Sequence, residues 1–260
     1  MNQEKTIRQR LKDGETVFGM FYKLNSPAAV EMIGWSGLDF IVVDCEHSAI
    51  SYEGVEDIVR TSEGVGLSTI VRVPSAQDEH IFHALDSGAS GVQIPNLTAV
   101  EQFRDSVRST KYYPEGCRGL SRQTRNCMYG FWDETEKPYV QAANENSLVV
   151  VHIENKEMAD AVDEICQIPQ IDVIFVGPAD MSQSLGIPGK STDPRVVEVA
   201  AKVLETANRY GKAGGINVTS KADMERYIDL GARYILYSSD TGLFAKGLKE
   251  LAKQFSPYRI

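Results

Sequence analysis

Two carboxylates, each placed just after an apolar run, are the residues of this chain best suited to chemistry. Glu154 follows the run Leu148–Ile153, and Asp180 follows Val173–Val176 after a Gly-Pro-Ala turn. Short runs rich in β-branched residues indicate strands buried on both faces, as in a parallel sheet. Carboxylates at the carboxyl ends of successive strands meet at one rim, where α/β enzymes place their chemistry. Two hard oxygen ligands there suit a divalent cation such as Mg2+ or Mn2+.

The structural alternative for both carboxylates is N-capping of the helices expected at 156–166 and 181–185. Capping explains one such carboxylate well. It explains less well why two of them come immediately after fully apolar strands, so we favour metal ligation by Glu154 and Asp180.

A second group of titratable residues follows the apolar run Phe40–Val43, where Asp44, Glu46 and His47 come in quick succession. A histidine beside a carboxylate is a common general base, because the carboxylate orients the ring and raises its basicity. The alternative is an aspartate that caps the following turn next to a solvated histidine. The residues alone leave both interpretations open.

Arg72 lies inside the apolar run Thr69–Val73, and buried arginines are rare unless they are paired. A planar guanidinium can bind a substrate carboxylate with two hydrogen bonds, and we favour this role for Arg72 over a structural ion pair.

Asp86 stands before Ser-Gly, and its neighbours alone indicate a helix-end or turn residue. His80 and His83 lie on one expected helix without a third ligand, so we interpret them as helix-surface residues.

Short apolar runs alternate with helical patterns along the whole chain, which predicts a parallel sheet closed as an eight-stranded (β/α)8 barrel. A doubly wound open sheet is the alternative, but no glycine-rich fingerprint follows the first strand. The expected strands are Val17–Tyr22, Phe40–Val43, Thr69–Val73, Gly91–Ile94, Leu148–Ile153, Val173–Val176, Ala213–Val218 and Tyr234–Tyr237. The expected helices are 26–36, 52–63, 76–87, 98–109, 135–145, 156–166, 194–210, 219–230 and 241–254.

The composition is that of a cytoplasmic enzyme with one domain over residues 1–260. Apolar residues make up 42% of the chain, and the net charge is −9 without a Lys/Arg block. Nucleic acid and membrane are therefore poor partners, and no apolar run approaches the ~18 residues of a membrane span. The four cysteines lack CxxC spacing and indicate reduced thiols in a reducing compartment.

The connection 110–134 is unusually long and carries several basic residues. Loops of this length are usually lids, binding loops or interface elements. Since it comes after the fourth strand, we expect it on the catalytic rim. The Arg118-Gly119 step could present backbone N–H groups to an anion or form an ordinary turn. Arg122 and Arg125 could contact a substrate acid or a partner subunit.

Taken together, these segments resemble the HpcH/HpaI class II aldolases, which cleave 2-oxo-acid aldols. The resemblance implies a (β/α)8 TIM barrel with an additional N-terminal helix and a C-terminal helix exchanged with a partner, in a homohexamer built as a trimer of dimers. The order and spacing of the matching segments make the resemblance to this family specific. The matching segments are Asp44–His47, Val71–Pro74, Leu85–Ala89, Val92–Pro95, Tyr113–Gly119, Ile153 with Glu154, Phe175–Asp180 and Gly214–Ile216.

The resemblance also implies roles for individual residues. Glu154 and Asp180 would ligate Mg2+, Mn2+ or Co2+. Arg72 would hold the carboxylate and oxo group of pyruvate, and His47, with Asp44, would act as the base or orient it.

Further roles follow from the same resemblance. Asp86 would support the site as a transition-state stabiliser, which replaces its interpretation as a turn residue. Ala179, with Asp180, would contact substrate through the chain at that turn.

Two departures from the family fall where substrate is held. His152 stands where the family usually has a glutamine that contacts the oxo acid, and 120–126 replaces a glycine-rich stretch. We count His152 among the substrate-binding residues, where it would add a pH dependence that glutamine cannot. The alternative is a histidine satisfied within the core.

The function that these features predict is a metal-dependent aldolase that releases pyruvate, or a related 2-oxo acid, and an aldehyde. One alternative is a citrate-synthase-like condensation on an oxaloacetate-type enolate. The other is a barrel that binds oxo acids without turnover. No strand core contains a lysine that could form a Schiff base.

Overall fold

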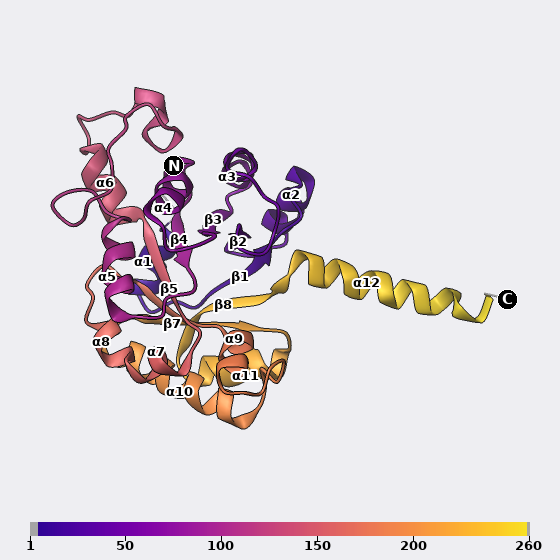
Figure 1. Cartoon of the computed structure of the whole chain (residues 1–260). Coiled ribbons are helices and arrows are strands. Elements are labelled where there is room, and N and C mark those ends of the chain that lie inside the picture. Colours follow the sequence, from indigo (N-terminus) through magenta and orange to yellow (C-terminus); the bar gives the residue numbers. More distant parts are fainter. Residues whose placement is uncertain (1–4, 259–260) are drawn as a thin grey trace.

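Eight parallel strands close into a barrel in the computed structural model, which describes residues 5–258 (Figure 1). Strands that follow one another in the chain pair with one another, and β1 pairs with β8 to close the ring. The predicted (β/α)8 TIM barrel is therefore confirmed. The strands are β1 (Val17–Tyr22), β2 (Phe40–Asp44), β3 (Ser68–Arg72), β4 (Gly91–Ile94), β5 (Leu148–Ile153), β6 (Val173–Val176), β7 (Ala213–Val218) and β8 (Ala232–Ser239).

Helices connect the strands, and α1 (Ile7–Lys12) precedes the first strand. The expected helix 156–166 is divided at Ala161 into two short helices. None of the helices within residues 5–258 is both long and apolar enough to cross a membrane. The others are α2 (Pro27–Trp35), α3 (Tyr52–Gly64), α4 (Asp78–Asp86), α5 (Val100–Arg108), α6 (Tyr139–Asn146), α7 (Lys156–Asp160), α8 (Val162–Cys166), α9 (Pro178–Ser184), α10 (Pro194–Arg209), α11 (Lys221–Asp229) and α12 (Asp240–Phe255).

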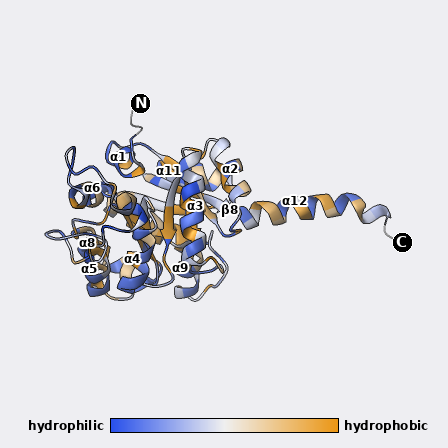
Figure 2. Ribbon diagram, turned by 90° about the horizontal axis from the view of Figure 1, so that it is seen from above, coloured by the Kyte–Doolittle hydropathy of each residue, from blue (hydrophilic) through white to orange (hydrophobic). Residues whose placement is uncertain are grey.

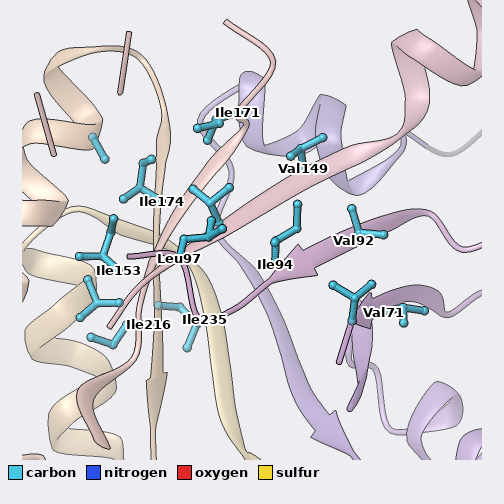
Figure 3. Close-up of a cluster of buried hydrophobic side chains, with 14 of the residues drawn as sticks. Val71, Val92, Ile94, Leu97, Val149, Ile153, Ile171, Ile174, Ile216 and Ile235 are labelled. Atoms are coloured by element: carbon cyan, nitrogen blue, oxygen red, sulfur yellow. The ribbon is translucent and has the colours of Figure 1, made fainter. Parts of the chain in front are cut away.

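The alternation of side chains along each strand divides the core into two layers. One layer fills the barrel with residues such as Val42, Ile70 and Val150, and Ile7 and Leu11 of α1 close it at the amino ends of the strands. The other layer lies between the strands and the surrounding helices (Figure 3). A strand position can therefore be assigned to the barrel interior or to the helix side by its parity alone.

The long connection between α5 and α6 lies at the opposite rim from the one we expected. Helix α5 returns the chain to the amino ends of the strands before the loop begins. Arg125 of the loop donates to the carbonyl of Ser87, which lies just before β4 starts. The expectation of a loop on the catalytic rim is therefore wrong, because the helix that follows the fourth strand carries the chain back to the opposite rim before the loop begins.

Helix α12 projects away from the barrel (Figure 1). Its first residue, Asp240, is buried and accepts hydrogen bonds from the backbone N–H groups of Lys23 and Leu24, both at 2.9 Å. Beyond that anchor the helix is exposed and carries an alternating pattern of polar and apolar residues (Figure 2).

Candidate active site

A cavity of about 490 Å3 opens at the carboxyl ends of the strands. Six of the residues predicted from the sequence line it: His47, Arg72, His152, Glu154, Ala179 and Asp180. Asp44 lies directly beneath, fully buried. The structure thus brings together side chains from β2, β3, β5 and the start of α9, as expected for the catalytic rim of a barrel.

Arg72 and Asp44 form a bidentate ion pair under this cavity. Nε and Nη2 of Arg72 donate to the two carboxylate oxygens of Asp44 at 2.9 and 2.6 Å, and Lys23 Nζ lies 2.9 Å from the same carboxylate. Burial raises the pKa of Asp44, but the hydrogen bonds and charge of Arg72 outweigh it and lower that pKa to about 2. Asp44 is therefore an anion that holds Arg72 in one orientation.

The remaining side of the Arg72 guanidinium faces Glu46, with Nη1 3.0 Å from Oε2. The guanidinium also lies over the ring of Phe21, at 4.6 Å from its centroid. Glu46 is held in turn by the side-chain amide of Asn96 at 2.5 Å. Arg72 is therefore both a structural ion-pair residue and a cation in the cavity wall, so the two interpretations of its sequence position are compatible.

His47 stands at the mouth of the cavity, and its ring is 58% exposed. Asp44 Oδ1 accepts the backbone N–H groups of Glu46 and His47 at 3.2 and 3.1 Å, so Asp44 shapes the turn and does not contact the ring. The carboxylate beside the ring is Glu46, 3.6 Å from Nε2. The position of Glu46 in the sequence indicates a titratable residue but predicts no role for it.

Glu154 is 8% exposed and accepts the Asn96 backbone N–H at 2.9 Å on Oε2. Its Oε1 lies 2.5 Å from His152 Nδ1. Burial raises the pKa of Glu154, whereas its interaction with His152 and the Asn96 N–H lower it, to about 2 overall. Glu154 does not cap the next helix. Asn155 is the N-cap, and its side chain accepts a hydrogen bond from the backbone N–H of Met158.

His152 is 1% exposed and lies beneath Glu154, where both ring nitrogens have partners. The Tyr234 hydroxyl donates to Gln93 Oε1 at 3.1 Å, and the Gln93 amide nitrogen faces His152 Nε2 at 2.5 Å. That ring nitrogen accepts, so a neutral ring carries its proton on Nδ1 and donates it to Glu154. A buried chain of hydrogen bonds therefore runs from β8 through β4 to Glu154.

Asp180 lies in the first turn of α9, whose N-cap is Gly177. A Cβ on Gly177 would lie 3.1 Å from Glu154 Cγ and 3.7 Å from Asp180 Oδ2. A side chain at position 177 would thus crowd Glu154, and its absence lets both carboxylates lie close to this turn. Two anionic oxygen donors beside one cavity have the chemistry that a small divalent cation requires.

Asp86 is not brought to this cavity within one chain. It ends α4 at the amino rim of the barrel, where it forms an ion pair with buried Arg118. Arg122 pairs with Glu134, and Arg125 with Glu63. A second cavity, about 970 Å3, lies between the long loop and this rim and is larger than the first. The charged side chains that line the larger cavity are mainly basic, whereas the first cavity brings Glu154 and Asp180 together with Arg72 and His47.

Several cavity residues were not identified from the sequence, namely Lys23, Asn217 and Ser238. Lys23 and Asn217 are in phase with residues that point into the barrel, Phe21 and Gly215, so alternation along β1 and β7 could have revealed them. Ser238 lies where the pairing of β8 with β1 shifts, so alternation along β8 could not have revealed it.

Comparisons with known proteins give the family and fold to which this chain is similar. The family described as HpcH/HpaI aldolase/citrate lyase matches residues 17–247. A 5-keto-4-deoxy-D-glucarate aldolase of Shigella sonnei is 32% identical over 237 residues, 91% of each chain. The structure of an HpcH/HpaI aldolase from Desulfitobacterium hafniense superposes with a TM-score of 0.90 at 29% identity and covers 97% of both chains. The structure of citrate synthase SbnG gives a TM-score of 0.85 at 31% identity over 96% of this chain and 97% of that one.

Proposed function

This chain belongs to the HpcH/HpaI aldolase/citrate lyase family of carbon–carbon lyases, and we propose that it is a divalent-metal-dependent aldolase. Its substrate would be a 4-hydroxy-2-oxo acid, cleaved to pyruvate or a related 2-oxo acid and an aldehyde. The observation that carries the proposal is the convergence of Arg72, Glu154 and Asp180 on one cavity. The name of the relatives, 5-keto-4-deoxy-D-glucarate aldolase, supports a sugar-acid derivative as substrate.

The proposed metal ligands are Glu154 and Asp180. Within residues 5–258, no three His, Cys, Asp or Glu side chains form a metal-binding group. Two carboxylates are nevertheless enough for Mg2+, Mn2+ or Co2+ when water and substrate oxygens complete the shell. Gly177 supports this assignment because both carboxylates lie close to it and a side chain there would crowd Glu154. When bound, the cation supplies a Lewis acid that stabilises negative charge on the substrate oxo group.

The roles of the other residues follow from charge and position. Arg72 binds the substrate carboxylate or oxo group, while Asp44 and Glu46 fix its guanidinium. His47, at the cavity mouth, accepts the proton of the 4-hydroxyl. The C3–C4 bond then breaks, the aldehyde carbonyl forms, and the bonding electrons pass to C3 and the oxo oxygen. Protonation at C3 yields the 2-oxo acid. Ala179 and Asp180 border the substrate in this arrangement.

The test is carbon–carbon bond formation between pyruvate and a panel of aldehydes, with Mn2+ or with excess chelator. We expect product only with metal. Adding Mg2+, Mn2+ or Co2+ to chelator-treated protein should restore its activity. Full activity in excess chelator would exclude the metal-dependent mechanism. Glu154→Ala should lose Mn2+ binding, which titration calorimetry measures independently of turnover.

A second candidate function is supported by the likeness to citrate synthase SbnG. In that case an acyl thioester would lose a proton from its α-carbon, that carbon would add to the oxo carbon of an oxaloacetate-type acid, and hydrolysis would release the thiol. Product formed from oxaloacetate and an acyl thioester, but not from pyruvate and aldehydes, would favour this candidate. Binding of oxo acids without product from any pair would favour a non-catalytic barrel.

We also propose that the chain is cytoplasmic and assembles as a homohexamer, a trimer of dimers, through exchange of α12. The projecting helix with exposed apolar residues supports exchange. The four cysteines are free thiols, which supports a reducing compartment.

A further inference from the structure

Asn96, two residues after the end of β4, holds two carboxylates of the active site at once. Its backbone N–H donates to Glu154 Oε2 at 2.9 Å, and its side-chain amide donates to Glu46 Oε1 at 2.5 Å. Glu154 follows β5 and Glu46 follows β2, and the strands lie in the order β2-β3-β4-β5 around the barrel. Asn96 therefore joins the carboxylate of the proposed metal site to the carboxylate that faces Arg72.

The side chain of Asn96 acts on Glu46. The Glu46 side chain is 10% exposed, and its Oε2 lies 3.0 Å from Arg72 Nη1. This oxygen is buried and has no hydrogen-bond partner within residues 5–258. In the described part of the chain, the amide of Asn96 is therefore the hydrogen-bond donor that fixes the Glu46 carboxylate. Without that amide, Glu46 regains rotamer freedom and holds Arg72 less firmly.

The backbone of Asn96 acts on Glu154. It lies in the left-handed region, with φ 60°. Glycine and asparagine adopt this conformation more readily than other residues, and β-branched residues are rarely found in it. A residue that does not hold this φ would change the path of the chain after Pro95 and move the N–H away from Glu154.

We infer that Asn96 is a positioning residue with two separable effects: its amide orients Arg72 through Glu46, and its left-handed backbone orients Glu154. The inference rests on the proposed function, in which Arg72 binds the oxo acid and Glu154 binds the metal. Groups that orient metal ligands contribute about 10–100-fold in metal affinity. The amide should therefore affect substrate binding, and the backbone should affect metal binding.

Three variants of Asn96 separate the two effects. Asn96→Gly keeps the left-handed backbone and its N–H but lacks the amide. The KM for pyruvate should rise by ~5-fold or more, the size of one lost hydrogen bond, while the Mn2+ dissociation constant stays as in the parent chain. Asn96→Asp also tolerates this φ but sets a carboxylate against Glu46, so it should raise the KM at least as much. Asn96→Val loses the amide and disfavours the left-handed backbone, so its Mn2+ dissociation constant should rise as well, by ~10-fold.

Titration calorimetry measures Mn2+ binding without turnover. Exchange of the C3 protons of pyruvate in D2O, with saturating Mn2+, reports enolate formation and gives the KM for pyruvate without any aldehyde. Met128→Val is the matched control for the backbone, because Met128 also has a left-handed φ, 50°, but belongs to the long loop at the opposite rim. It should keep both constants of the parent chain.

The inference is overturned, and the aldolase proposal stands, if the parent chain binds Mn2+ and exchanges pyruvate protons while all three Asn96 variants keep its constants. Equal loss of metal and substrate binding in Asn96→Gly and Asn96→Val would also overturn it, because a general structural role does not separate the two. A parent chain that neither binds Mn2+ nor exchanges pyruvate protons would overturn the proposed function itself. Asn96→Asp decides the effect of the amide should Asn96→Gly not fold.

Discussion

The guanidinium of Arg72 meets two carboxylates, Asp44 and Glu46, and still borders the cavity. The sequence predicts that Arg72 has a partner, because a charged side chain buried in a strand requires one. It does not predict which residue the partner is, because that depends on the strand register that sets Asp44 opposite Arg72.

Arg72→Lys keeps the charge but loses the planar fork. We expect turnover per folded molecule to fall by ~10-fold or more, about 1.4 kcal/mol in the transition state. The free energy of unfolding should also fall, by about 1–3 kcal/mol, because Asp44 loses its two hydrogen bonds from Arg72 and Glu46 loses its ion pair. Urea unfolding and steady-state kinetics measure the two effects. Loss of stability with unchanged turnover would make Arg72 a structural residue only.

Among single residues, His152 differs most between the sequence-based expectation of a substrate-binding side chain and the buried position that the structure gives it. The sequence places it two residues before Glu154, and alternation along a strand predicts that both face one side. Its contacts with Gln93 and Glu154 come from a neighbouring strand and from ring orientation, which sequence spacing does not determine. The buried position agrees with the alternative of a satisfied core histidine. Substrate binding by His152 itself stays a prediction.

We expect Gln93→Leu to weaken Mn2+ binding by ~10-fold, because groups that orient metal ligands contribute this much. Leucine keeps the volume but removes the donor to His152 Nε2, so that His152 no longer fixes Glu154. Titration calorimetry measures the dissociation constant. Tyr234→Phe, which removes only the outermost hydrogen bond, should have a smaller effect. Equal Mn2+ affinity in Gln93→Leu and the parent chain would contradict this positioning role.

At the scale of elements, the strands were predictable to within one or two residues because each is a short apolar run bounded by turn residues. The rim at which the loop after α5 lies was not predicted correctly, because it depends on whether the loop follows a strand or the helix after that strand. The same loop holds buried Lys111, whose Nζ donates to the carbonyls of Asn144 and Ser147 at 2.8 and 2.9 Å. Lys111 thus ties the loop to the end of α6.

Burial, followed by the charge of Arg8, lowers the pKa of Lys111 from its usual 10.5 to about 8. Between these values the folded chain binds fewer protons than the unfolded chain, so stability rises with pH. From pH 8 to 10.5 the gain is up to about 3 kcal/mol. We expect the free energy of unfolding of the parent chain to rise over this window relative to Lys111→Met, which cannot titrate. Urea unfolding measures this free energy for both chains, and the same dependence on pH in the parent chain and in Lys111→Met would contradict the prediction.

The junction between β6 and α9 offers a test of the carboxylate pair that leaves the carboxylates in place. Gly177 has φ −93°, which alanine also adopts, so Gly177→Ala should fold. Its methyl group would occupy the space 3.1 Å from Glu154 Cγ and should weaken Mn2+ binding by ~10-fold. Gly64→Ala, at a helix end with open space around it, is the control. Equal Mn2+ affinity in Gly177→Ala would place the metal elsewhere.

At the scale of the whole molecule, the strands and helices between Val17 and Ser239 belong to one closed barrel, which supports the proposal of a single domain over residues 1–260. Helix α12 is the exception to this compact arrangement. The large apolar side chains of this helix are about half exposed, and an exposed apolar face of this size is typically covered by another surface. The helix itself was predictable from its periodicity, whereas its direction away from the barrel was not.

The apolar residues Phe244, Leu248, Leu251 and Phe255 recur at three- and four-residue spacing, so they share one face of α12, and they are 46–61% exposed. We expect Leu248→Asp to divide the assembly into smaller species, because a charge on this face cannot be buried against a partner. Light scattering after size exclusion measures the mass. Lys246→Glu, on the opposite face, is the control and should keep the parent mass. An unchanged mass for Leu248→Asp would show that this face of α12 lies outside the subunit interface, and the exchange of α12 would then be excluded as the basis of assembly.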